Sequence, residues 1–319
     1  MNTSATSGAN ASRTVLVTGG CGFIGVNLAR SLVAAGYEPV AYDNLSTGRL
    51  EDGKAAGFAE IIEADILDAD ALARAARGVY GIVHLAARTG VVDSVEDPRG
   101  DLEVNVGGTL NALLAARDGG ASAFVFASSG APLGSVEPPG HEGLAPRPLS
   151  PYGASKLAGE GLCSAFAGSY GLPANALRFT NVYGPYSYHK GSVVAAFMKR
   201  IMDGGPLVVY GDGSQTRDFL FVDDLCRAVV AVLERRPQGE LFQLGTGVET
   251  SVSELVAALV AVFPGREVDI RYEPARAGEI ARSFSDIAHA RRALDYRPSV
   301  SLDEGLRVTR DWFVSMQRA

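Results

Sequence analysis

The sequence contains few of the residues that build disulfides, metal sites or nucleic-acid surfaces. Its 319 residues include three cysteines and four histidines. Cys21, Cys163 and Cys226 are odd in number and widely spaced, which fits neither a disulfide framework nor a metal site. Acidic residues outnumber basic ones by 36 to 29, and no basic run is interleaved with aromatic residues. We therefore expect a cytoplasmic protein that has no metal ion and does not bind nucleic acid.

Long hydrophobic runs are also missing. No apolar stretch approaches the roughly 20 residues that a membrane-spanning helix needs, so we expect no membrane association. Residues 1–12 lack the charged and apolar regions of a signal peptide, and we predict that they form a disordered leader. The hydrophobic content is nevertheless 47%, which is enough for a chain of this length to bury a large core.

Short apolar runs that alternate with helical spacing dominate the first 180 residues. The runs lie at 15–17, 38–42, 59–62, 81–85, 124–126 and 174–179. Segments with helical spacing lie between them at 23–35, 68–76, 104–117 and 152–170. Beyond residue 180 we expect helices near 192–202 and 222–233 and a strand at 241–244. The alternation predicts an α/β fold whose doubly wound parallel sheet has helices on both faces.

A glycine-rich turn follows the first predicted strand and opens the first predicted helix. It reads TGGCGFIG (18–25), and its glycines permit a tight turn that lets a pyrophosphate approach the helix N-terminus. Asp43 ends the second strand, 18 residues beyond Gly25, where its carboxylate can bind both ribose hydroxyls and would repel a 2′-phosphate. Asn44, not arginine, follows it. The pattern predicts a Rossmann-type site for NAD in preference to NADP.

A tyrosine and a lysine occur four residues apart near a predicted helix start. Ser150 can cap this helix and Pro151 can occupy its first turn, so Tyr152 and Lys156 should share one face. A nearby ammonium favours the phenolate, which predicts a lowered pKa for Tyr152. Tyr152 could then take a proton from a sugar hydroxyl as hydride leaves for the nicotinamide, while Ser129 holds the reacting oxygen. The alternative is an unrelated surface pair.

Together these motifs resemble the extended short-chain dehydrogenase/reductases. The resemblance is to the NAD-dependent epimerase/dehydratase family, and within it to the UDP-glucose and UDP-glucuronate 4-epimerases. It extends from about residue 14 to about residue 298. It also includes HLAA (84–87), NVGGT (105–109), RFTNVYGP (178–185), GDGSQTRDFLFVDD (211–224) and RAGE (276–279).

The resemblance implies a set of site residues and a partner for each. It assigns NAD contacts to Gly19, Gly22, Phe23, Ile24, Gly25, Asp43, Asn44, Asp65, Ile66, Leu85, Ala86, Ala87, Asn105, Tyr152 and Lys156. It assigns contacts with a UDP-sugar to Ser128, Ser129, Asn181, Val193, Val194, Tyr210, Arg217 and Arg276. Two alternatives stay open from the residues alone: Asp65 as a helix cap, and either arginine as a surface charge or structural ion pair. His84 is expected to pack structurally.

The same resemblance predicts the domain organisation. We expect residues 13–180, together with 223–248, to form the NAD-binding Rossmann domain. Residues 181–222 and 249–319 should form a smaller C-terminal α/β lobe that binds the nucleotide sugar. A homodimer through the helices near 101–117 and 152–170 is the expected assembly.

The residues after Ser129 bear on the reaction. Family 4,6-dehydratases have an Asp and a Glu here, and decarboxylases typically have a Glu, whereas this chain has Gly130 and Ala131. The loop therefore predicts a 4-epimerase that acts through a transient 4-keto sugar. Another oxidoreductase of the family is the alternative, and a non-catalytic dinucleotide-sensing protein is a remote one.

Several departures leave the hexose open. Pro132 and Leu133 replace the usual Val-Tyr, and Val92 replaces an arginine common in glucuronate 4-epimerases. His189 and Lys190 could meet a carboxylate, a diphosphate or only water. Ser283 is small where some epimerases have a tyrosine, which leaves space for an N-acetyl group.

Overall fold

A seven-stranded parallel sheet forms the centre of the molecule. The computed structural model describes residues 13–275 and 280–317. The strand order is β11-β6-β5-β4-β1-β2-β3. The strands are β1 (Thr14–Thr18), β2 (Glu38–Asp43), β3 (Glu60–Glu63), β4 (Gly81–His84), β5 (Ala123–Ser129), β6 (Ala174–Phe179) and β11 (Leu241–Leu244). Each neighbouring pair is parallel, which confirms the predicted Rossmann-type fold class.

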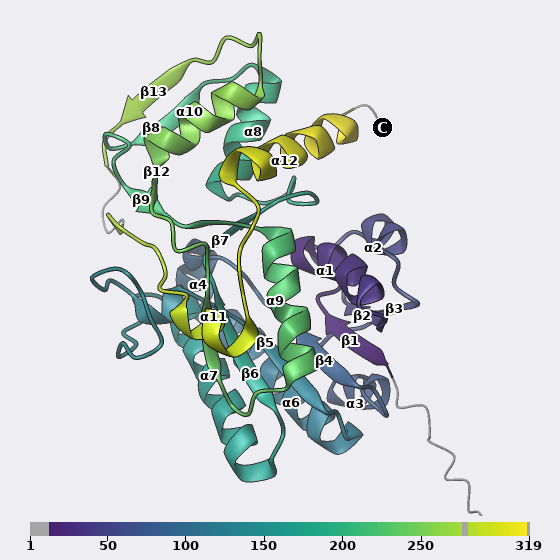
Figure 1. The fold of residues 1–319 in the computed structure, drawn as a ribbon. Coiled ribbons are helices and arrows are strands. Elements are labelled where there is room, and N and C mark those ends of the chain that lie inside the picture. Colours follow the sequence, from purple (N-terminus) through teal and green to yellow (C-terminus); the bar gives the residue numbers. More distant parts are fainter. Residues whose placement is uncertain (1–12, 276–279, 318–319) are drawn as a thin grey trace, which may run out of the picture.

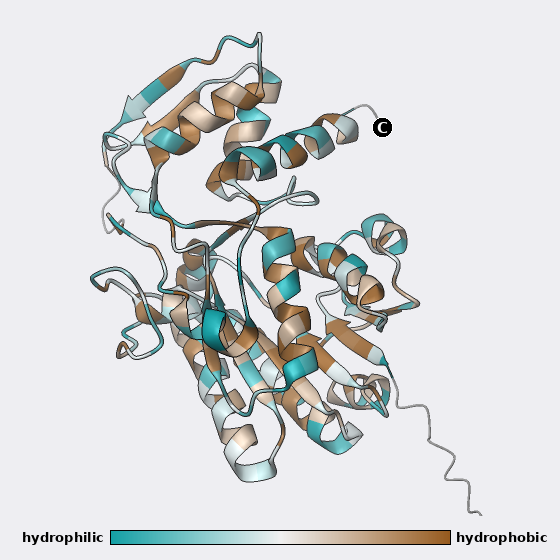
Figure 2. Cartoon of the chain, in the orientation of Figure 1, coloured by the Kyte–Doolittle hydropathy of each residue, from teal (hydrophilic) through white to brown (hydrophobic). Residues whose placement is uncertain are grey.

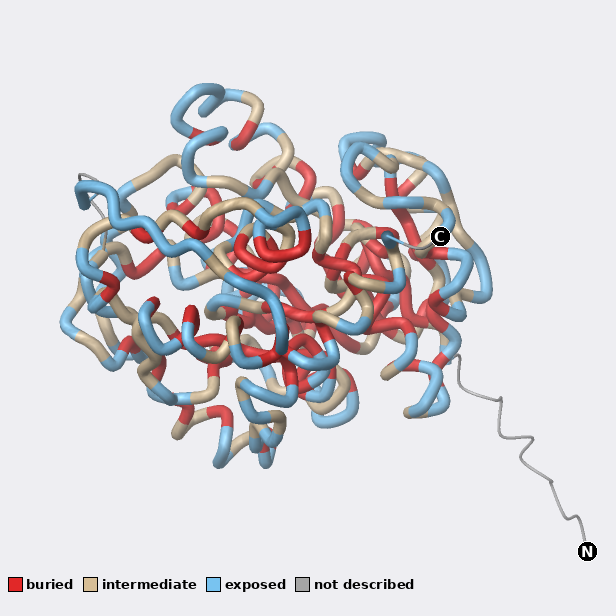
Figure 3. The backbone as a smooth tube through the Cα atoms, turned by 90° about the horizontal axis from the view of Figure 1, so that it is seen from above, coloured by how far each residue is buried: buried red, intermediate tan, exposed pale blue. Residues whose placement is uncertain are grey.

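Helices cover both faces of this sheet, as Figure 1 shows. On one face lie α1 (Phe23–Ala34) and α9 (Val222–Arg235), and on the other lie α3 (Ala69–Ala75), α6 (Gly108–Gly119) and α7 (Pro151–Tyr170). Strand alternation supplies a separate core to each face, because successive side chains point to opposite sides. Val15 and Val17 join the first core, whereas Leu16 joins the second. The strands other than the edge strand β3 are accordingly buried along most of their length (Figures 2 and 3).

Several shorter elements were not predicted. They are α2 (Leu50–Ala56), α4 (Val91–Glu96), α5 (Pro98–Leu102), a 3₁₀ turn (Ala131–Leu133) and α11 (Ala288–Leu294). The predicted helix at 104–117 is split, because a π-helical turn at Glu103–Gly107 precedes α6. None of the helices within the described ranges has the length and apolar character needed to span a membrane.

A smaller lobe stands above the carboxyl ends of the strands. It contains α8 (Val193–Asp203), α10 (Val252–Val262) and α12 (Leu302–Met316), which share a third hydrophobic core, and the parallel pair β8 (Leu207–Tyr210) and β13 (Ile270–Glu273). Two further pairs connect it to the sheet. They are the parallel β7 (Asn181–Tyr183) with β10 (Phe219–Phe221) and the antiparallel β9 (Thr216–Arg217) with β12 (Thr250–Ser251). The chain thus crosses between the two units more than once.

A buried ion pair joins α7 to the neighbouring strands β5 and β6. The Arg178 guanidinium donates to both carboxylate oxygens of Glu160, at 2.8 and 2.7 Å, and the Ser128 hydroxyl donates to the same carboxylate at 2.5 Å. The side chains of Arg178 and Glu160 are 2% and 7% exposed. This bidentate geometry fixes the position of α7 relative to the end of β5.

We predict that Glu160→Gln lowers the free energy of unfolding by about 3–5 kcal/mol, because it leaves the Arg178 cation buried without its counter-ion. Chemical denaturation would measure this. The control Glu60→Gln removes an exposed carboxylate and should change stability by less than about 0.5 kcal/mol. Replacing Glu160 and Arg178 together by methionine should recover much of the loss. A single variant as stable as the parent would contradict this account.

Candidate active site

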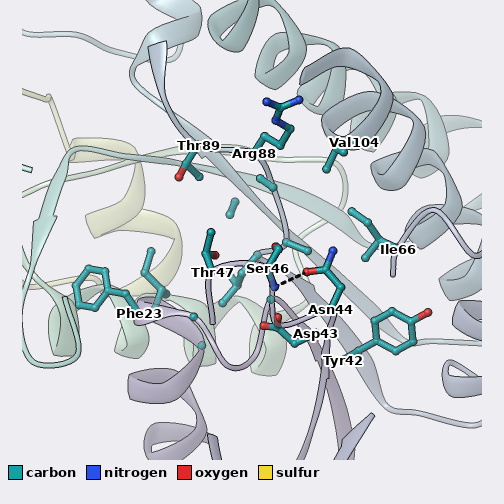
Figure 4. A pocket seen from close by; sticks show the side chains of 18 of the residues that line it. Phe23, Tyr42, Asp43, Asn44, Ser46, Thr47, Ile66, Arg88, Thr89 and Val104 are labelled. Carbon is teal, nitrogen blue, oxygen red and sulfur yellow. Dashed lines mark hydrogen bonds between the residues drawn. The ribbon is translucent and has the colours of Figure 1, made fainter. Parts of the chain in front are cut away.

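A cavity of about 490 Å³ opens at the carboxyl ends of β1, β2, β4 and β5. It brings together most of the residues expected to contact NAD. They are Gly19, Gly22, Phe23, Ile24, Gly25, Asp43, Asn44, Asp65, Ile66, Leu85, Ala86, Ala87, Tyr152 and Lys156. Figure 4 shows Phe23 on one side and Ile66 with Tyr42 on the other, with Asp43 and Asn44 between them.

The glycine-rich turn leaves this cavity open for a diphosphate. Gly19 has φ +70°, and a Cβ there would lie 2.7 Å from the backbone nitrogen of Ala86. A Cβ on Gly25 would lie 2.4 Å from the carbonyl oxygen of Gly20. Gly22 is the N-cap of α1 and makes no side-chain hydrogen bond, so amides of the first helical turn have no partner among the described residues. These features suit the pyrophosphate of a dinucleotide.

Asp43 is held at the end of β2 by two backbone amides. Its carboxylate accepts from Cys21 N at 2.9 Å and from Leu45 N at 2.8 Å. Burial raises its pKa above the usual value, although both hydrogen bonds oppose that effect. Carboxylate oxygens have two acceptor sites each, so both can still accept from ribose hydroxyls. The cavity therefore fits NAD at this end.

Asp65 and Asn105 have structural partners. Asp65 accepts from Asn44 Nδ2 and from Leu67 N, both at 2.8 Å, and α3 is capped by Asp68 instead. Asn105 is absent from the lining of the cavity and is buried behind it. Its amide nitrogen donates to the Arg88 carbonyl at 3.0 Å, and its oxygen accepts from Arg88 N at 2.9 Å. Asn105 thus shapes the backbone after β4.

Tyr152 and Lys156 lie near the start of α7 and both face the cavity. Ser150 caps this helix by accepting from Gly153 N at 3.1 Å, and Pro151 begins it, as the sequence predicts. Lys156 Nζ donates to the carbonyl oxygen of Ala127 at 2.8 Å and lies 5.9 Å from the centroid of the Tyr152 ring. Burial lowers the pKa of Lys156 to about 8.

The expected lowering of the Tyr152 pKa is not found in the protein alone. Burial raises this pKa, and a hydrogen bond with Ser129 opposes the rise. The reason is that the phenol has left water, while the Lys156 ammonium is directed to the backbone of β5. The two serines at the end of β5 also differ. Ser128 donates to Glu160, which leaves Ser129 as the hydroxyl beside Tyr152.

A second cavity, of about 470 Å³, begins at Ser129 and reaches the smaller lobe. Asn181, Arg217 and Ser283 line it, and so does Leu133, which is 4% exposed. Arg217 Nη1 donates to the carbonyl oxygens of Thr216 and Ile280. Among the described residues, no Asp, Glu, His or Lys lines this cavity.

A third cavity, of about 260 Å³, brings Asn181, Val193 and Val194 next to Tyr152. Tyr210, at the end of β8, lines none of the three cavities. Arg276 lies outside the described residues.

Two polar side chains in the second cavity were missed by the sequence analysis. Thr180 Oγ1 and Gln243 Oε1 are buried and have no hydrogen-bond partner in the described part of the chain. Buried polar atoms are normally satisfied, so unpaired ones in a cavity indicate contact with a polar ligand or water. No local motif could have identified them, because their position at the cavity depends on how β6, β11 and the smaller lobe meet.

His84 is buried between two threonines. Its ring nitrogens lie 2.7 Å from Thr18 Oγ1 and 3.1 Å from Thr109 Oγ1, and burial lowers its pKa to about 3. It therefore packs as a neutral residue.

Comparison with known proteins agrees with this geometry. Residues 15–245 match the model of the NAD dependent epimerase/dehydratase family. A UDP-glucose 4-epimerase of Mycolicibacterium smegmatis is 38% identical over 93% of this chain and 97% of its own. The crystal structure of a UDP-glucose 4-epimerase with UDP-glucose from Thermotoga maritima has a TM-score of 0.89 and is 34% identical, covering 95% of this chain and 99% of its own.

Relatives with other activities match over a similar extent. A dTDP-glucose 4,6-dehydratase of Xanthomonas campestris is 32% identical over 95% of this chain and 94% of its own. The family is NAD-dependent, and the cavity under the glycine-rich turn fits that cofactor. The chain belongs to the NAD dependent epimerase/dehydratase family.

Proposed function

We propose that this protein is an NAD-dependent UDP-hexose 4-epimerase. The observation that carries the proposal is the composition of the second cavity, where Ser129 borders a space with no acidic lining residue in the described chain. A dehydratase or decarboxylase of this family is expected to place a carboxylate there. An epimerase needs only the Tyr152 and Ser129 hydroxyls and room for the sugar.

Each of the residues near the reacting sugar has a separate role in the proposed reaction. NAD held by the residues that line the first cavity would supply the hydride chemistry, as acceptor of the C4 hydride and as its donor to the rotated ketone. Tyr152 takes the proton of the C4 hydroxyl and gives it back, while Ser129 donates to the same oxygen. Lys156 is held by its bond to Ala127 at 5.9 Å from the centroid of the Tyr152 ring, where its charge would stabilise a phenolate formed during the reaction, although burial raises the Tyr152 pKa in the protein alone. Space beyond Ser129 lets the 4-keto sugar rotate.

The remaining assignments belong to the same proposal. The residues that line the first cavity bind NAD, and Asn105 supports them by holding the Arg88 backbone. Asn181, Val193, Val194 and Arg217 bind the nucleotide sugar from the smaller lobe. A homodimer through α6 and α7 is part of the proposal, as is a cytoplasmic location.

The activity can be tested with UDP-glucose, UDP-glucuronate and UDP-N-acetylglucosamine, followed by chromatographic separation of the C4 epimers. We expect interconversion of at least one pair with no net consumption of NAD. Release of water or CO₂, or stoichiometric formation of NADH, would indicate another oxidoreductase of the family. No reaction with any of the three would count against the proposal.

Tyr152→Phe removes the hydroxyl that exchanges the C4 proton. We expect kcat to fall at least about 100-fold, within the range of general acid–base contributions. Affinity for UDP should stay within about threefold, because the diphosphate and base are held elsewhere. Initial rates and calorimetric titration with UDP would measure the two effects. Epimerisation at the parent rate would refute the role of Tyr152.

Asp43→Asn removes the charge that faces the adenosine ribose. We expect NAD to bind about tenfold more weakly, as for loss of a hydrogen bond to a charged group, and discrimination against NADP to shrink. Titration of cofactor-free protein with each dinucleotide would show this. Asp70→Asn, an exposed position in the first turn of α3, is the matched control and should leave both affinities unchanged. Unaltered selectivity in Asp43→Asn would exclude the assigned contact.

A further inference from the structure

One lysine of the loop between β7 and α8 faces two cavities. Lys190 lines both the first cavity, assigned to NAD, and the third cavity, which contains Asn181 and Val193. Phe23 and Ile24, at the start of α1, are likewise shared by the two cavities. Lys190 is the only charged side chain among the described residues that lines the third cavity. It is therefore placed where the two spaces meet.

The loop holds Lys190 in a defined backbone position. Lys190 N donates to the Ser187 carbonyl at 2.9 Å, and the Ser187 hydroxyl donates to the Gly184 carbonyl at 2.6 Å. The carbonyl oxygen of Lys190 accepts from Lys199 Nζ at 3.2 Å. These bonds occupy the backbone of the loop and the Lys199 ammonium, but they leave the Lys190 ammonium uncommitted.

The Lys190 ammonium has no counter-ion in the described part of the chain. It makes no ion pair or side-chain hydrogen bond there, and burial alone lowers its pKa. The neighbouring charges are mainly positive. The pKa of His189 is lowered first by its burial and then by Lys190, with smaller effects of Lys199 and Arg49, while Asp52 opposes them. A partly buried cation without a partner is unfavourable, so the site favours an anion.

The cavities that Lys190 faces indicate which anion this is. Lys190 does not line the second cavity, although the third cavity, which it does line, also contains Ser129 and Tyr152. The first and third cavities share Lys190 with Phe23 and Ile24 of the first turn of α1, where the pyrophosphate of a dinucleotide is expected. Residues assigned to the cofactor and to the nucleotide sugar surround Lys190, and each of these ligands carries a diphosphate.

We propose that Lys190 binds a diphosphate group at the junction of the cofactor and substrate cavities. The inference rests on the proposed function for the identity of the two ligands. The ligand chemistry is a nucleoside diphosphate, which both the nucleotide sugar and NAD contain. An ammonium can contact phosphate oxygens of either group as a point charge, whereas arginine would form a bidentate pair.

The test compares the parent with Lys190→Met, which keeps an apolar stem of similar length and removes the charge. Calorimetric titration of the NAD-loaded protein with UDP and with uridine separates phosphate contacts from base contacts. Retention of NAD during gel filtration and its dissociation constant test the cofactor. We expect at least a tenfold loss of affinity for UDP, for NAD or for both, with uridine binding unchanged.

Two variants serve as controls. Lys190→Arg keeps the charge and should bind UDP and NAD within about threefold of the parent. Lys54→Met removes a lysine from the exposed face of α2 and should change neither affinity, although it alters the net charge equally. The difference in affinity between the parent and Lys190→Met should become smaller at high salt, because salt screens the charge contact that the parent makes with the ligand.

The pattern of losses identifies the ligand. A loss for UDP alone assigns Lys190 to the substrate, a loss for NAD alone assigns it to the cofactor, and losses for both assign it to the two diphosphates together. Equal losses for UDP and uridine would overturn the inference, because they would show a change of loop shape. So would unchanged binding of both UDP and NAD. A parent protein that binds neither ligand would overturn the proposed function as well.

Discussion

The carboxylate of Glu160 connects the parts of the protein on which the site depends. Glu160 lies on α7, Arg178 on β6 and Ser128 at the end of β5, and all three meet in one buried hydrogen-bonded group. Lys156, one turn earlier on α7, donates to the Ala127 carbonyl of the same strand. These bonds place Tyr152 beside Ser129. Replacing both members of a buried charge pair by apolar side chains has little net effect on stability, but the intact pair tolerates few alternative geometries. Such rigidity suits the proposed reaction, in which two hydroxyls contact one oxygen.

The distribution of charge around this centre separates three tasks. Near the glycine-rich turn, open amides favour the cofactor's pyrophosphate, and Asp43 favours the ribose hydroxyls. Beside Ser129 the second cavity is lined without carboxylates in the described chain, which suits the neutral ketone intermediate of the proposed 4-epimerase reaction. At the junction, the Lys190 ammonium has no counter-ion among the described residues, and we propose that a diphosphate pairs with it. This separation of charge arises at the carboxyl ends of the parallel strands, because the loops that follow the strands there line the cavities.

Much of the cofactor end could be predicted because its signals are local. The turn at 18–25, the acid at Asp43 and the Tyr152–Lys156 spacing each depend on one strand or helix and the turn next to it. The substrate end could not be predicted to the same degree. Tyr210 lines none of the cavities, and Thr180 and Gln243 carry unpaired buried atoms that no motif marks. Their environments arise from contacts between segments more than 60 residues apart.

The sequence by itself determined the fold class and the glycine-rich turn, because strand and helix periodicity and glycine spacing depend only on residues that are close together in the chain. It also showed that no acid follows Ser129. Only the tertiary structure decided the direction in which the Tyr152 pKa shifts, since burial raises it while Lys156 donates to Ala127. It also placed the Lys190 side chain at the first and third cavities and away from the second. The physical reason is that desolvation and charge pairing depend on the whole surroundings of a group, which no short stretch of chain specifies.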